Sequence, residues 1–284
     1  MDKSKTLLLD TGNLLFQRYN AEEAGVYRER HNLIIEAMNM MSYDIANLGI
    51  NDISPDIRML EDRCQKAAFT TLSANATIKG DCKQHPIQKY IIKEVNGIRI
   101  GITGVMPNAI PAIEGNLTEG KFNIDDPKTA LDKIIPNLAA KTDYIILLSS
   151  FNYKDTLNLL TQIPAIDLGL CIETERLPLP FSDDNSQKPT PPLIMNITTR
   201  GMELGMLNIE KDKNRVSITH AEIISLGQKV PSDEKILELS WKLKEWEKKK
   251  KIDDELLKKQ GHEALLKNLE LSPEEFFKQQ SKKE

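Results

Sequence analysis

Aromatic residues, cysteines and histidines are all scarce in this sequence. Aromatic side chains make up 5% of the 284 residues, and the net charge is only −4, from 38 basic and 42 acidic residues. Proteins that read nucleic acids more often combine a basic face with interleaved aromatic side chains. The composition therefore argues against nucleic acid as a partner, and it offers no overall charge that would draw the chain to an anionic membrane.

Cysteine occurs three times, as Cys64, Cys82 and Cys171. The count is odd, the residues are far apart, and no Cys-x-x-Cys pair is present. The pattern therefore supports neither a disulfide framework nor a zinc site. We expect these residues to be buried or lone thiols.

Long apolar runs are also absent, and no stretch is long and apolar enough to cross a bilayer. Residues Met1–Lys5 lead directly into an apolar segment, without the hydrophobic region and small-residue cleavage site of a signal peptide. As written, the chain is expected to be cytoplasmic, unless its natural start lies upstream of Met1.

What the sequence does contain is a recurring strand ending. The apolar run Thr6–Leu9 ends in Asp10, a small residue, Gly12 and Asn13. Three later segments end in a comparable way, at Asn47–Asp52, Leu147–Ser150 and Leu170–Glu175. Because open α/β sheets build their sites at the carboxyl ends of the strands, these endings predict one composite site.

Apolar segments alternate with helical patterns as far as residue 75, which predicts parallel strands with crossover helices, one of them over 31–42. The pair Asn96-Gly97 joins two strands, 87–95 and 98–105, and predicts a hairpin. A polar loop with five prolines follows over 175–192. Beyond it, three antiparallel strands are predicted at 193–198, 205–211 and 215–222.

From Pro231 the composition becomes helical and charged, with Ser232 as the expected cap. Apolar residues recur at heptad-like spacing in Ile236, Leu239, Leu243 and Trp246, and the run Lys248–Lys251 follows. Further helix is expected up to a last short helix that begins at Ser272. Such a tail either packs along the domain with a solvated outer face or serves as a partner-binding or dimerising helix.

In their order and spacing, these segments resemble the 5′-nucleotidase branch of the calcineurin-like metallophosphoesterases. The resemblance covers Thr6–Ile224 and rests on the segments Leu8–Asn13, Met41–Gly49, Leu72–Asn75, Val95–Gly104, Ile166–Asp167 and Arg200–Gly205. It implies an α/β fold of two stacked sheets flanked by helices. We therefore expect a metallophosphoesterase-like domain over residues 1–230 and a charged helical tail over 231–284.

The resemblance also implies a chemistry, in which two divalent metals activate a water and clamp a phosphate. Carried over position by position, the metal and catalytic residues of that family are nearly all replaced here. Its bridging Gly-Asp is Gly12-Asn13, and its Gly-Asn-His-Glu motif is Gly49-Ile50-Asn51-Asp52. A further ligand histidine is Ser150, the two histidines of Gly-His-Thr-His are Glu173 and Glu175, and the first Asp-x-His motif would precede Thr6.

The four histidines that do occur fall on none of these positions. They are His31, His85, His220 and His262. We interpret them as core or surface residues rather than as ligands.

Two other interpretations of the strand ends stay open. Asp10, Glu173 and Glu175 could form an oxygen-only site for calcium or magnesium, or they could be solvated acids. Of the residues at the dismantled positions, Asn13, Glu173 and Glu175 are the weak candidates for metal ligands. Ser150 as a nucleophile is disfavoured, because no histidine sits at a matching strand end and no Gly-x-Ser-x-Gly elbow is present.

The sequence thus predicts a domain that has lost its dinuclear metal site. It would have no catalytic residue and no cofactor, and it would act as a binding or structural module through its helical tail or proline-rich loop. The alternative is an active metal-dependent phosphoesterase with an altered or truncated site for manganese, magnesium or calcium. By resemblance to the family, a start upstream of Met1 would imply a periplasmic protein. Some relatives are fused to multihaem cytochromes, but no Cys-x-x-Cys-His motif occurs here.

Overall fold

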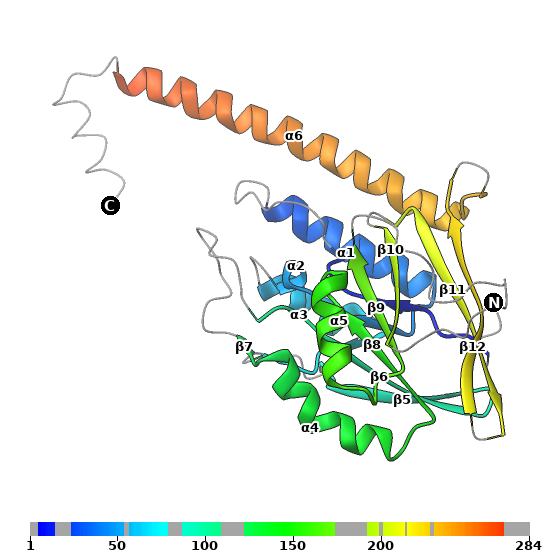
Figure 1. The fold of residues 1–284 in the computed structure, drawn as a ribbon. Helices are drawn as coiled ribbons and strands as arrows, with labels where there is room; N and C mark the ends of the chain where they lie inside the picture. The colour runs from blue at the N-terminus through cyan, green and yellow to red at the C-terminus, as the bar shows by residue number, and fades with distance from the viewer. Residues whose placement is uncertain are drawn as a thin grey trace. The chain divides into compact units, whose positions relative to one another are not determined.

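The structure is a computed structural model that describes nine segments of the chain. These are residues 5–14, 24–53, 57–78, 87–108, 122–173, 192–198, 201–213, 215–227 and 230–269. The chain forms two units, residues 1–232 and 233–284, which are described separately (Figure 1). The predicted domain boundary between residues 230 and 231 stays a prediction.

The first unit contains a short parallel sheet of three strands. The strands are β1 (Leu9–Asp10), β2 (Ile45–Asn47) and β3 (Thr70–Leu72), in the order β1-β2-β3. The carboxyl ends of all three strands therefore meet at one edge, as the alternating pattern before residue 75 predicts.

A second sheet of five strands has the order β10-β9-β8-β6-β5. Its strands are β5 (Tyr90–Val95), β6 (Ile98–Val105), β8 (Tyr144–Ser149), β9 (Leu168–Glu173) and β10 (Leu193–Thr198). All neighbours are parallel except β5 and β6. The turn between those two has positive φ at Asn96 and Gly97, as a two-residue hairpin requires, so the predicted hairpin is confirmed.

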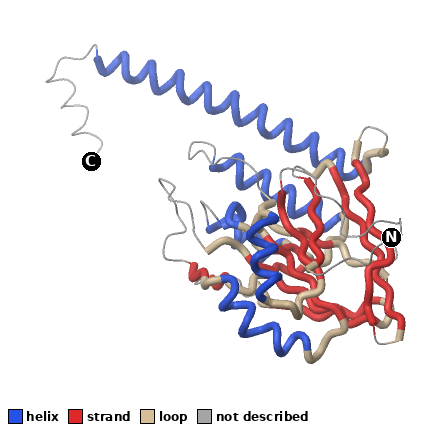
Figure 2. The backbone as a smooth tube through the Cα atoms, viewed as in Figure 1, coloured by secondary structure: helices blue, strands red, loops and turns tan. Residues whose placement is uncertain are grey.

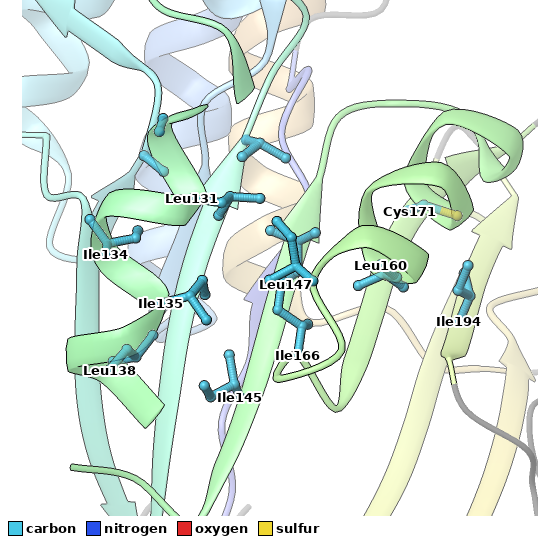
Figure 3. Packing of buried hydrophobic residues seen from close by; sticks show 14 residues of the cluster. Leu131, Ile134, Ile135, Leu138, Ile145, Leu147, Leu160, Ile166, Cys171 and Ile194 are labelled. Carbon is cyan, nitrogen blue, oxygen red and sulfur yellow. The ribbon is translucent and has the colours of Figure 1, made fainter. Parts of the chain in front are cut away.

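The two sheets stack face to face, and alternate residues of β8 face opposite sides. Ile146 and Leu148 join the core between the sheets, where they meet Ile45 and Leu72 of the smaller sheet. Ile145 and Leu147 face the other way, toward helices α4 (Pro127–Ala139) and α5 (Tyr153–Gln162). Figure 3 shows Leu131, Ile135 and Leu138 of α4 directed at these β8 side chains. The fully apolar β8 is therefore buried on both faces, as its sequence predicts.

Helices cover the outer faces of both sheets (Figure 2). On the smaller sheet, Ile35 and Met38 of α1 (Ala24–Met40) pack with Ala46 of β2. Helix α3 (Ile57–Lys66) lies beside α1 and packs Leu60 and Cys64 near the strand ends. The result is a mixed α/β sandwich of helices, sheet, sheet and helices, which is the fold class that the sequence predicts.

The remaining elements are short or peripheral. They are α2 (Ile50–Ile53), β4 (Ala76–Ile78), β7 (Phe122–Ile124), β11 (Glu203–Asp212) and β12 (Arg215–Ser225). Strand β4 pairs with β7, and β11 forms an antiparallel ribbon with β12.

Two predictions about the elements of this unit are corrected. Strand β10 pairs in parallel with β9, so the three late strands are not one antiparallel group. Helix α1 begins at Ala24 rather than at His31, because its first turns carry polar residues that hide the helical period.

The second unit contains α6 (Glu234–Leu269), a single helix of 36 residues. Asp233, not Ser232, caps it, since its carboxylate accepts hydrogen bonds from the backbone N–H of Lys235 and Ile236. Five large apolar side chains of α6 are 45–64% exposed, namely Leu237, Trp241, Ile252, Leu256 and Leu257. The predicted helix at Ser272 lies outside the described residues.

The cysteines also differ from expectation. Cys171 is a free, buried thiol, as predicted, and burial raises its pKa to about 12. Cys64 is disulfide-bonded, so the prediction of a lone thiol is wrong at that position. Cys82 lies outside the described residues.

Candidate functional site

Three of the four predicted strand ends meet, those after Asp10, Asn47 and Leu148, and the side chain of Asn47 at the end of β2 links them. Its side-chain amide donates to the carbonyl of Thr11 after β1 (3.1 Å) and to that of Val105 at the end of β6 (2.9 Å). It also lies 2.9 Å from the hydroxyl of Ser150, directly after β8. One buried side chain therefore links strand ends from both sheets.

The close approach of the two sheets at this point depends on Gly104 of β6. A Cβ atom at Gly104 would collide with the side-chain oxygen of Asn47. That oxygen is buried and has no hydrogen-bond partner among the described residues. The glycine therefore allows the amide of Asn47 to sit between the sheets.

Ser150 lies at the predicted position but is engaged with the backbone. Its hydroxyl lies 3.1 Å from the carbonyl oxygens of both Thr11 and Leu48, so its one hydrogen is shared between them. It also accepts from the amide of Asn47. The hydroxyl therefore connects three loops, which fits a structural role and not a nucleophilic one.

Asp52 accepts several hydrogen bonds from the two loops around it. Its carboxylate accepts from the backbone N–H of Gly49 (2.8 Å), Asn13 (3.0 Å) and Leu14 (2.8 Å). Nη1 of Arg63 lies 3.3 Å from the same carboxylate, and both side chains are completely buried. Asp52 thus holds the loop after β1 against the loop after β2.

Arg63 was not singled out by the sequence. It lies on the apolar side of α3, between Leu60 and Cys64, and it donates to Thr71 Oγ1 and to the carbonyls of Ala46 and Asn47. Its guanidinium also lies 5.4 Å from the centre of the Phe69 ring. A charged residue at an apolar position of a short helix was the available signal, because such a residue is buried only with partners.

Asn13 adopts a left-handed backbone with φ of 60°, which asparagine tolerates better than most residues. Its side-chain oxygen accepts from the backbone N–H of Asn51 (3.0 Å), at the start of α2. Ile50, beside Asn51, packs its side chain against the apolar cluster that contains Leu48 and Met106. Asn13 and Ile50, which stand at two of the motif positions of the resembled family, are therefore engaged in local hydrogen bonding and in packing.

Asp10, the last residue of β1, has a perturbed carboxyl group. Burial raises its pKa to about 6, the charge of Asp52 adds to the rise, and the charge of Arg63 opposes it. The carboxylate also accepts from the N–H of Gly12 (2.7 Å), which lowers the pKa in turn.

Of the two glutamates at the predicted positions, the structure describes Glu173. Glu173 ends β9, and its carboxylate accepts from the N–H of Tyr153 (3.3 Å) in the first turn of α5. A carboxylate at a helix amino terminus is favoured by the helix dipole. Glu175 lies outside the described residues, so the proposed oxygen-only site of Asp10, Glu173 and Glu175 stays a prediction.

Among the histidines, His31 lies in the core, which is one of the two environments that the sequence predicts. It is completely buried, and neither ring nitrogen has a hydrogen-bond partner among the described residues. Burial lowers its pKa to about 4, against the opposing charge of Asp52. His220 is partly exposed on β12, and the side chains of His85 and His262 lie outside the described set.

Within the described segments, no three His, Cys, Asp or Glu side chains are grouped as ligands of one metal ion. The same segments include no helix that is both long and apolar enough to span a membrane.

The fold is that of the calcineurin-like phosphoesterases. The structure superposes on calcineurin-like phosphoesterase YfkN from Bacillus subtilis with a TM-score of 0.64, at 21% identity, covering 84% of this chain and 83% of that one. It superposes on a 5′-nucleotidase precursor from Thermus thermophilus with a TM-score of 0.64, at 20% identity over 84% of this chain and 48% of that one.

Two curated phosphoesterases are similar to this chain in sequence. Over 160 residues the chain is 28% identical to the trifunctional nucleotide phosphoesterase YfkN of Bacillus subtilis, covering 51% of this chain and 11% of that protein. Over 225 residues it is 23% identical to a 2′,3′-cyclic-nucleotide 2′-phosphodiesterase/3′-nucleotidase of Haemophilus influenzae, covering 71% and 33%. The chain thus spans a third or less of these relatives. No protein-family model matches it.

Proposed function

We propose that this chain is a metallophosphoesterase-like domain without a dinuclear metal centre, and that it acts as a non-catalytic binding or structural module. The observation that carries the proposal is the buried pair of Asp52 and Arg63, surrounded by loops whose polar groups bond to one another. The proteins similar to this chain in sequence and structure are calcineurin-like nucleotidases and phosphoesterases.

Among the described residues, the donor atoms at the strand ends do not fit two divalent cations. A dinuclear centre needs several oxygen and nitrogen ligands whose lone pairs converge on the metals. Here the oxygen of Asn13 accepts from Asn51, and the carboxylate of Asp52 accepts three backbone N–H groups. Ile50 offers no donor atom, and Ser150 is bonded to backbone carbonyls.

The charge at the site argues in the same direction. Arg63 places a buried positive charge 3.3 Å from the carboxylate of Asp52, and the same charge lowers the pKa of Asp10. Like charges repel strongly where water is excluded, so this guanidinium would oppose cations bound beside it. Arg63 thus supplies the counter-charge of Asp52 without a metal ion.

A module needs a surface for its partner, and α6 supplies one. The exposed Leu237, Trp241 and Ile252 are accompanied by Leu256 and Leu257 along a helix rich in charged residues. Trp in particular is enriched at protein interfaces. We propose α6, together with the proline-rich loop of residues 175–192, as the regions that contact a protein partner.

The test is hydrolysis of p-nitrophenyl phosphate and its bis-ester by the purified chain, with and without manganese. We expect no metal-dependent turnover above a buffer blank, and no heat of manganese binding in a calorimetric titration. Asn13→Ala and the exposed Asn123→Ala serve as matched variants, because only the first lies at the strand ends.

Manganese-dependent turnover that is lost in Asn13→Ala and kept in Asn123→Ala would overturn the proposal. It would establish instead the alternative, an active phosphoesterase with an altered metal site. The activities for which the relatives are named, on nucleotides and cyclic nucleotides, would then give the first substrates to try.

A further inference from the structure

Helix α6 exposes an apolar stripe along much of its length. Four large apolar side chains, each 45–59% exposed, recur at spacings of four, eleven and four residues: Leu237, Trp241, Ile252 and Leu256. At about 3.6 residues per turn, four residues advance about 40° beyond one turn and eleven advance about 20° beyond three turns. The four side chains therefore fall within about 100° of the helix circumference and form one exposed stripe.

This stripe is separate from the heptad-like positions that the sequence singles out. Leu239, one of those positions, is only 6% exposed and lies about 160° around the helix from Trp241. Leu257 lies on the same side as Leu239, although it is 64% exposed. The contacts that bury Leu239 therefore do not cover the exposed stripe, which is free to meet an occupant of its own.

The charges on and beside the stripe are arranged symmetrically about the middle of α6. The midpoint of its 36 residues lies beside Ile252. Glu245 precedes Ile252 by seven residues and Lys259 follows it by seven, and seven residues make about two turns, so both lie on the stripe. Lys248 precedes Ile252 by four residues, and Glu255 follows it by three. Positions on the two sides of the midpoint thus carry opposite charges.

We propose that α6 pairs with α6 of a second copy of this chain, antiparallel and about a two-fold axis at Ile252. In this arrangement, a residue before the axis faces the residue at the same distance beyond it in the partner. Ile252 meets the partner's Ile252 in the centre. Glu245 meets the partner's Lys259, and Lys248 meets the partner's Glu255. The two-fold axis forms each of these ion pairs twice.

The charges select the antiparallel orientation over a parallel one. In a parallel pair in register, each residue faces its own copy, so Glu245 would face the partner's Glu245 and Lys248 the partner's Lys248. Like charges across a helix pair are unfavourable, and charges beside the apolar seam determine partner and orientation. A second copy supplies the complementary charges at the matching spacing, which is the reason to assign it as the occupant.

The inference rests on the proposed role of α6 as a contact surface, and it names the partner. Exposed ion pairs add little affinity, so burial of the apolar stripe has to supply most of it. The two proposals fail separately. Manganese-dependent turnover would overturn the proposed lack of catalysis and leave the helix pairing intact, whereas a chain that stays monomeric would overturn the pairing alone.

The first experiment is sedimentation equilibrium of the full purified chain, from micromolar to millimolar concentrations and at low and high salt. We expect a reversible equilibrium between monomer and dimer. The dimer fraction should fall as salt is added, because salt screens the ion pairs. A monomer at every concentration would overturn the proposal.

The second experiment compares the neighbouring Leu256→Ala and Leu257→Ala in the same measurement. Both remove the same atoms from an exposed position of α6, but only Leu256 lies on the stripe. Leu256→Ala should raise the Kd of the dimer about tenfold, because each copy loses buried apolar surface. Leu257→Ala should leave the Kd unchanged. Equal effects of the two variants would overturn the assignment of the stripe as the interface.

The third experiment tests orientation and register by exchange of charges. Glu245→Lys and Lys259→Glu should each raise the Kd about tenfold, because two attractions become two repulsions, and the double variant should restore the parent value. The two positions lie about 21 Å apart along one helix, so they compensate each other only between copies. Asp254→Lys, on the opposite side of the helix from Glu245, is the matched control and should change nothing. A double variant as weak as the single ones would overturn the antiparallel pairing.

Discussion

At the carboxyl ends of the parallel strands Asp52 pairs with Arg63, and at their amino ends Asp143 pairs with Arg99. The first pair is completely buried, 3.3 Å apart, and surrounded by backbone donors. The second is 3.0 Å apart, with Arg99 52% exposed, and Lys211 adds a second cation at 3.2 Å. The shorter pair is the one in contact with water.

Distance alone therefore says little about what each pair contributes. Water screens the charges of Arg99 and Asp143, although the hydrogen bonds from Arg99 hold the pKa of Asp143 well below its usual range. At Asp52, no water replaces a lost partner, so removal of either charge leaves the other stranded in the core. The same two residue types thus form a solvated surface contact at one edge and a structural joint at the other.

The largest effect is expected from breaking the buried pair. Asp52→Asn should lower the free energy of unfolding by about 3–5 kcal/mol, because Arg63 is left without a counter-charge. Urea unfolding followed by circular dichroism measures this. The double variant Asp52→Asn with Arg63→Met should lose less than the sum of the single losses, since no charge stays unpaired. A loss below about 1 kcal/mol for Asp52→Asn would show that the buried pair of Asp52 and Arg63 does not hold the strand ends together.

Acid should weaken the same region through His31. Its folded pKa of about 4 lies below the ordinary value of 6.5, so between these pH values the unfolded chain binds a proton that the folded chain does not. The free energy of unfolding therefore has its full value above pH 6.5. It falls by about 3 kcal/mol in total as the pH drops to 4. His31→Leu should show a correspondingly smaller loss across this range of pH. An equal loss in both proteins would rule out His31 as the source.

Removal of the Ser150 hydroxyl should cost less, because it is neutral. Ser150→Ala deprives the amide of Asn47 of one of three acceptors, and we expect a loss of about 1–2 kcal/mol in urea unfolding. Ser217→Ala, on the exposed side of β12, is the matched control and should change stability by less than about 0.5 kcal/mol. Similar values for the two variants would mean that Ser150 does not join the strand ends.

The smallest effect is expected at the solvated pair. Asp143→Asn should leave the unfolding midpoint nearly unchanged at physiological salt, and any difference should shrink further as salt is added. A loss as large as that of Asp52→Asn would break the comparison between the two edges, because it would show that exposure does not separate them.

Much of this site could be predicted from the chain alone. The strand endings at Asp10, Asn47 and Ser150 identified which loops converge, and the resemblance singled out Asn13 and Asp52 within them. Arg63 escaped notice because a helical period reports which face is buried and not what a charge on that face meets. The disulfide of Cys64 was not predicted either, because the spacing of cysteines along the chain does not report how far apart they lie in the folded structure.

By itself, the sequence determined the local structure that depends on neighbouring residues. The hairpin at Asn96-Gly97 follows from the positive φ that these two residues accept, and the two-sided burial of β8 follows from its unbroken apolar run. Only the tertiary structure decided the contacts between distant segments. Asn47 meets Ser150 across 103 positions and Asn13 meets Asp52 across 39, and such pairings form only where packing of the two sheets brings the strand ends within hydrogen-bonding distance.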